Sequence, residues 1–119
     1  MNDVQVLVRE TKESLADYLP NLIAACDQVA EKFQTGQEDW VELFQAVLEG
    51  INWVTGAVQG IRNVESTTLL GLELERVIEL LQEVQAAMTN RDYVLFCDLL
   101  QYELKTLLQA YSDQVQQEL

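Results

Sequence analysis

The 119-residue chain contains no histidine. Histidine is the usual general base at neutral pH, so its absence excludes Ser–His and Cys–His nucleophile pairs. It also excludes metal sites that need imidazole, including the Glu-x-x-His di-iron sites of helical bundles. We therefore expect no catalytic residues, no metal site and no cofactor, and we predict that the protein is not an enzyme.

Basic residues are scarce as well. The chain has 7 Lys and Arg against 20 Asp and Glu, which gives a formal net charge of −13. Nucleic acids and anionic membranes are bound through clusters of Lys and Arg, and no two basic residues here are adjacent. No apolar segment approaches the roughly 20 residues of a membrane span, and no secretory signal precedes the chain's first helical segment. We expect no nucleic-acid partner, no membrane partner and a cytoplasmic location.

Cysteine occurs only at Cys26 and Cys97. Two cysteines are too few for a disulfide scaffold, which also fits a reducing compartment. Free cysteine usually behaves as a small apolar core residue, and this is the main interpretation here. Both cysteines are expected near the same end of the fold, pointing inward, so a thiol-based redox protein stays open as an alternative.

The chain is rich in apolar residues that recur every three or four positions, in four blocks separated by short polar breaks. This period is typical of the α-helix, which has about 3.6 residues per turn. Short connections make successive helices antiparallel neighbours. The sequence therefore predicts an all-α fold, an antiparallel up-down four-helix bundle that forms a single domain over residues 1–119. The predicted helices cover residues 3–34, 37–62, 67–89 and 91–116.

The first predicted helix contains the only proline, Pro20. Pro20 falls opposite the apolar stripe, so we predict one helix that is kinked on its solvent side. Residues 4–6 alternate between apolar and polar, and a short N-terminal strand stays open as an alternative. Gly36 favours the left-handed turn that often ends a helix.

The later breaks contain residues suited to helix caps. Ser66 or Thr67 can cap the third helix, and Asn90 or Asp92 can cap the fourth. The second helix holds three glycines, at positions 50, 56 and 60. Because each glycine costs a helix up to about 1 kcal/mol relative to alanine, we expect them to allow close approach of a neighbouring backbone.

The second and fourth helices carry more apolar surface than one bundle is expected to cover. Apolar positions of the second helix extend over about 240° of its circumference. The fourth helix has a second apolar stripe nearly opposite its core stripe, which we expect to face water. Exposed aromatic and apolar side chains are typical of protein interfaces. The predicted interaction surface consists of Leu43, Trp53, Ala57, Leu95, Leu99 and Tyr102.

These features predict a non-catalytic protein–protein interaction or scaffolding module that forms a homodimer through this surface. One alternative is a chaperone-like protein that holds the amphipathic helix of a partner.

Residues 48–54 and 90–95 read LEGINWV and NRDYVL. These segments resemble small, acidic helical proteins of Gram-positive bacteria whose function is uncharacterised, a resemblance that implies no activity. The same segments are similar to flagellar export chaperones, which are small helical bundles that hold a helix of an export substrate. That similarity implies a chaperone-like role. The N-terminal signature of the export chaperones is missing, so no binding residue is transferred from them.

Overall fold

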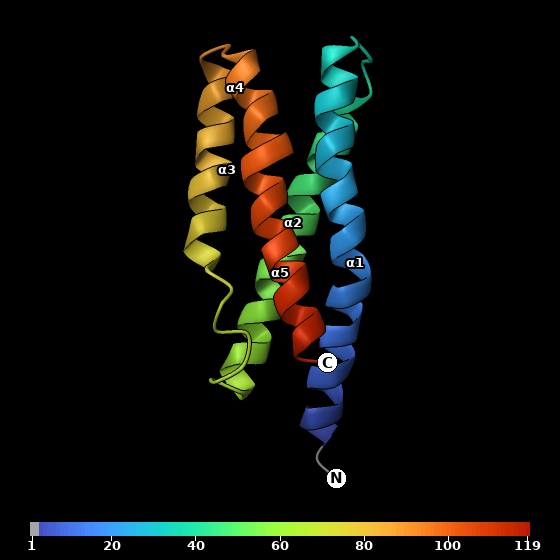
Figure 1. Cartoon of the computed structure of the whole chain (residues 1–119), viewed down its shortest axis with the longest axis vertical. Coiled ribbons are helices and arrows are strands. Elements are labelled where there is room, and N and C mark those ends of the chain that lie inside the picture. The colour runs from blue at the N-terminus through green and yellow to red at the C-terminus, as the bar shows by residue number, and fades with distance from the viewer. Residues whose placement is uncertain (1–2) are drawn as a thin grey trace.

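The computed structural model describes residues 3–119, which form helices and loops without any strand (Figure 1). The all-α prediction is therefore confirmed for this part of the chain. Helix α1 spans Asp3–Gln34, α2 spans Trp40–Val64 and α3 spans Leu74–Thr89. The last rod is continuous and consists of α4 (Tyr93–Asp98), the π-helical segment η1 (Leu99–Leu104) and α5 (Lys105–Gln117).

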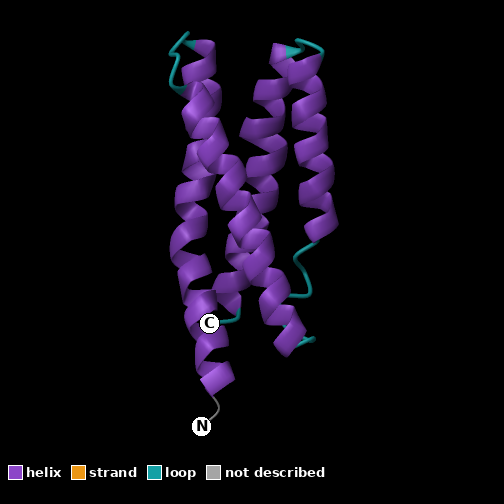
Figure 2. Cartoon of the chain, turned by 180° about the vertical axis from the view of Figure 1, so that it is seen from behind, coloured by secondary structure: helices purple, strands orange, loops and turns teal. Residues whose placement is uncertain are grey.

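The rods lie side by side and give an elongated body with principal extents of 53 × 22 × 19 Å (Figures 1 and 2). Helix α1 packs against α2 and α5. The chain turns between α1 and α2 at residues 35–39. Segment η1 contacts both α1 and α3. The last rod is therefore covered from two sides, a fact that decides which of its side chains reach solvent.

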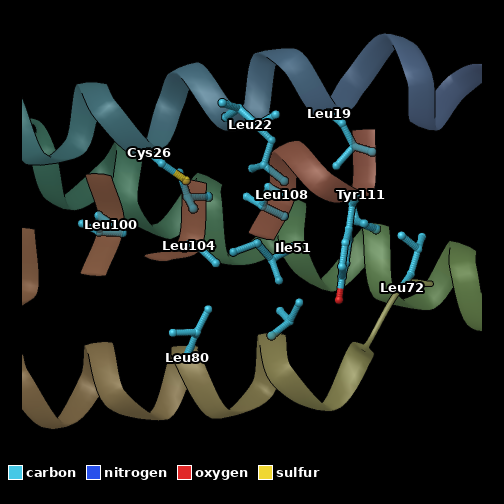
Figure 3. Packing of buried hydrophobic residues seen from close by; sticks show 14 of the residues in the cluster. Leu19, Leu22, Cys26, Ile51, Leu72, Leu80, Leu100, Leu104, Leu108 and Tyr111 are labelled. Carbon is cyan, nitrogen blue, oxygen red and sulfur yellow. The ribbon is translucent and has the colours of Figure 1, made fainter. Parts of the chain in front are cut away.

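The core runs along the shared axis of the rods (Figure 3). Apolar side chains from each rod meet there, and the helical period predicted most of them. Burial of one such leucine stabilises the fold by roughly 1.5–3 kcal/mol. Core residues with at most 1% exposure include Leu15, Leu19, Ile51, Leu80, Leu100, Leu104, Leu108 and Tyr111.

Several predictions about helix ends can be compared directly. Helix α1 begins at Asp3, so the alternative of a strand over residues 4–6 is wrong. Gly36 has a φ of 74°, and the Gln37 N–H donates to the Lys32 carbonyl at 2.9 Å, which confirms the left-handed turn. The carboxylate of Asp92 accepts a hydrogen bond from the Leu95 N–H at 3.2 Å, which confirms the predicted cap.

The predicted start of the third helix at residue 67 is wrong, and so is its cap by Ser66 or Thr67. The helix starts at Leu74, behind a loop over residues 65–73. Leu69 is buried in this loop with a φ of 53°, a left-handed conformation that does not fit within a right-handed helix. The Arg62 guanidinium donates to the Leu69 carbonyl and to the Leu72 carbonyl, the latter at 2.5 Å. Tertiary contacts thus keep this segment in a non-helical conformation, although its apolar residues have a helical period.

Candidate functional site

The solvent side of the α1 and α2 pair carries a long strip of residues that are exposed or half-buried, except for the buried Gly50. These residues recur at alternating intervals of three and four along both helices. A helix with this spacing presents one face to a partner helix, as in coiled coils. We call this strip the α1/α2 groove. The residues with this spacing are Val4, Leu7, Thr11, Ser14, Tyr18 and Asn21 on α1, and Ala46, Gly50, Trp53, Ala57, Gly60 and Val64 on α2; Val8, Asp17, Glu49 and Ile61 also line the groove.

Two hollows of different character follow each other along the α1/α2 groove. The first has a volume of about 690 Å³ and combines the aromatic rings of Tyr18 and Trp53 with the carboxylates of Asp17 and Glu49. The second has a volume of about 280 Å³, and apart from Thr11 its lining is apolar or glycine. The groove therefore has a mixed aromatic and acidic end and an apolar end.

The packing of the aromatic end depends on Gly50. The rings of Tyr18 and Trp53 pack edge to face, with centroids 5.2 Å apart and an interplanar angle of 76°. A β-carbon on Gly50 would overlap the Tyr18 hydroxyl group, so the predicted close approach to a neighbouring backbone is wrong here, and a side chain occupies the space instead. At Gly56 and Gly60 a β-carbon would meet nothing within 4 Å, so the same prediction is wrong there.

Two carboxylates, Asp17 on α1 and Glu49 on α2, line the α1/α2 groove, and the helical period relates three more to them. Asp3, Glu10 and Asp17 stand at intervals of seven on α1, and Glu42 and Glu49 are also seven apart on α2. An interval of seven is close to two helical turns, so each set lies along one edge of its helix. All five are exposed, and the ion pairs formed within residues 3–119 involve other acidic residues. We call these five residues the acidic rim.

Three of the predicted surface residues belong to α2. Trp53 is 45% exposed and Ala57 is half-buried, and both line the α1/α2 groove. Leu43 is half-buried and packs against the core. Leu43 therefore supports the fold more than it offers a contact.

The other three predicted residues lie on the last rod, beside α3. Leu95 and Tyr102 are exposed, at 43% and 65%. Leu99 is only 6% exposed, so our expectation that it faces water is wrong. Leu99 begins the π-helical segment, whose wider turns depart from the α-helical wheel used for the prediction, and α3 covers this side of the rod.

The predicted surface therefore divides into two. Trp53 and Ala57 line the α1/α2 groove, while Leu95, Leu99 and Tyr102 border hollows beside α3. The predicted surface contains no residue of α1 and so misses that side of the groove. The repeated acidic residues, each directly before a groove position of α1, are a signal that could have identified it.

The two thiols are buried and free. Burial, together with the charge of Asp27, raises the pKa of Cys26 to about 12, although Lys105 acts in the opposite direction. Burial also raises the pKa of Cys97, partly offset by a hydrogen bond with the Gln34 side chain. The thiolate is the reactive form of cysteine, and burial disfavours that form at both positions.

Two further findings concern the described residues, 3–119. They contain no group of three or more acidic or cysteine side chains placed to hold a metal ion. None of the helices in this range combines the length and apolar character needed to cross a bilayer.

Comparison with known proteins gives one match. Residues 10–114 match the family described as "Domain of unknown function (DUF8042)". Neither the curated proteins nor the solved structures contain a significant match to the chain. The similarity to flagellar export chaperones stays a prediction.

Proposed function

We propose that this chain, which belongs to the DUF8042 family, is a non-catalytic protein-binding module that holds an amphipathic helix of a partner in the α1/α2 groove. The observation that carries the proposal is the alternating spacing of groove residues on both helices. A helix laid between α1 and α2 would bury its apolar face there, as in other helix-in-groove complexes. Trp53 and Tyr18 supply the large, partly polar rings that often dominate such contacts.

The scaffold that we propose for this function is an antiparallel up-down four-helix bundle in one domain. The directions of successive rods in Figure 1 support this arrangement. We also propose that α1 is kinked at Pro20, which is exposed and has no N–H to donate within the helix. Buried free thiols support a location in the reducing cytoplasm.

The test uses a synthetic helical peptide with leucines along one face and glutamines elsewhere. Isothermal titration calorimetry should show binding to the wild-type chain. Trp53→Glu should weaken binding at least tenfold, since loss of a central aromatic contact typically costs about 2 kcal/mol or more. Tyr102→Glu is the matched control on the other surface and should bind normally. Thermal unfolding verifies that both variants fold. Absence of binding, or equal binding by Trp53→Glu, would contradict the proposal.

Self-association is a second candidate, supported by the exposed apolar side chains on the last rod. Leu95 and Tyr102 are exposed and line the same hollow beside α3. We propose that a homodimer would use this surface and leave the α1/α2 groove free. Sedimentation equilibrium should then give a dimer mass that Tyr102→Glu reduces and Trp53→Glu does not. A monomer mass for the wild-type chain at high micromolar concentration would reject this candidate.

A further inference from the structure

We infer that the occupant of the α1/α2 groove is a basic amphipathic helix, apolar along one face and bearing Lys or Arg along its edges. The inference rests on the proposed function, and it specifies the chemistry of the partner. It depends on the acidic rim, on the lack of an ion pair to that rim among residues 3–119, and on the difference between the two hollows.

The acidic rim supplies carboxylates that form no ion pair within the part of the chain that the structure describes. Asp17 on α1 and Glu49 on α2 line the same hollow from opposite sides. No basic side chain lines either hollow of the groove within residues 3–119. Lys32 and Lys105 are paired with acidic partners elsewhere, at 2.8 and 2.6 Å. A partner's Lys or Arg would therefore meet unpaired carboxylates on both edges.

The same charges disfavour a second copy of this chain as the occupant. An isologous contact brings identical surfaces together. Two copies of the acidic rim would then face each other, in molecules that each carry a net charge of −13. Like charges placed across an interface suppress association, whereas a basic helix is attracted to the rim and steered toward it.

The two hollows set a register for the occupant. Leu7 lines the apolar hollow and Tyr18 lines the acidic one. Tyr18 is the eleventh residue after Leu7 along α1. At about 1.5 Å per residue this is a separation of roughly 16 Å, or three helical turns. The partner should therefore carry a large apolar side chain, such as Leu, Met or Phe, about three turns from a pair of basic side chains. Ala57 and Gly60 leave room for that apolar side chain.

The experiment compares three labelled peptides that share one leucine face and differ only along their edges. The edges carry Lys, Gln or Glu. Fluorescence anisotropy with the full chain should rank the affinities Lys above Gln above Glu. The advantage of the Lys peptide should shrink as salt is raised, because exposed charges are screened. Equal affinities, or a preference for the Glu peptide, would overturn the inference.

A variant with both Asp17→Asn and Glu49→Gln tests the rim directly. It should bind the Lys peptide about fivefold more weakly, the effect of two exposed ion pairs of typical strength. Its affinity for the Gln peptide should not change. The control carries Glu75→Gln and Glu83→Gln, which remove two exposed carboxylates from α3. If both variants lose the same affinity for the Lys peptide, the net charge of the chain attracts the peptide and the acidic rim has no specific role. That result would overturn the inference.

The same data separate this inference from the proposed function. If all three peptides bind equally and Trp53→Glu abolishes binding, the groove holds helices without charge selection, and only the inference fails. If Trp53→Glu leaves binding intact, or if none of the peptides binds, the groove is not a helix site. In that case the proposed function fails together with the inference.

Discussion

The ring of Tyr18 lies against the bare α-carbon of Gly50 and meets Trp53 edge to face, 5.2 Å away between centroids. A β-carbon on Gly50 would also lie 3.0 Å from the Leu22 side chain. Because Leu22 belongs to the core and Tyr18 to the groove, one glycine connects the packing of α1 on α2 to the shape of the candidate site.

Substitution of this glycine should therefore differ from substitution of its neighbour in α2. Gly50→Ala gains helix propensity but forces Tyr18 and Leu22 to move, and overpacking of this kind costs about 1–3 kcal/mol. Gly56→Ala is the matched control, since its β-carbon enters open space. It should stabilise the chain by about 0.5–1 kcal/mol. Urea denaturation measures both changes, and equal stabilisation by the two variants would contradict the packing at Gly50.

Leu99 and Leu95 offer a second matched pair, one turn apart on the last rod. Leu99 is 6% exposed and Leu95 is 43% exposed. Leu99→Ala should lower the free energy of unfolding by about 2–4 kcal/mol, the usual cost of removing a buried leucine side chain. Leu95→Ala should cost less than about 1 kcal/mol. Similar losses in both variants would mean that α3 does not cover Leu99.

The fold was predictable where burial follows the helical period. Leu15, Leu19 and Leu22 lie on one face of α1, and one face is all that a core contact requires. The exposure of Leu99 was not predictable in this way. It depends on the π-helical segment and on the position of α3. A helical wheel assumes the same rotation for every residue and contains neither of these features.

The site was only half predictable for a similar reason. Trp53 stood out because a large apolar side chain lay beyond the core stripe of its helix. Tyr18 did not, because it borders the core stripe of α1 and faces the groove only when α2 is placed beside it. The loop over residues 65–73 is a further case. Its polar contacts, such as those of Arg62 with the Leu72 carbonyl, join parts of the chain that local propensity does not relate.

Glu118 holds the 65–73 loop against the C-terminal end of the chain. Its carboxylate accepts hydrogen bonds from the Leu69 N–H at 3.0 Å and from the side chains of Thr68 and Gln114. Burial alone would raise the pKa of Glu118, but these hydrogen bonds and the charge of Lys12 outweigh it and lower the pKa. The folded state thus binds the proton more weakly than the unfolded state. The resulting stability is present above the ordinary glutamate pKa and is lost as the pH falls through the lowered value.

Glu118→Gln should therefore destabilise the chain at neutral pH by about 1.5–3 kcal/mol, the range for hydrogen bonds to a charged group. The difference from the wild type should vanish as the pH falls through the lowered pKa of Glu118, because both side chains are then neutral. Chemical denaturation at a series of pH values measures this convergence. Glu83→Gln on the exposed side of α3 is the control. Its free energy of unfolding should change with pH in the same way as that of the wild type. A constant difference at all pH values would contradict the role of the Glu118 charge.

The last prediction concerns the thiols. Cys26 and Cys97 are both buried, and burial is the largest cause of the raised pKa of each. Since the thiolate is the reactive form, neither should react quickly while the chain is folded. Labelling with a thiol-specific disulfide reagent at neutral pH should be slow in the native chain and fast in denaturant. Cys26→Ser and Cys97→Ser assign the two rates. Rapid labelling of either cysteine in the native chain would contradict the buried, neutral state and favour the redox alternative.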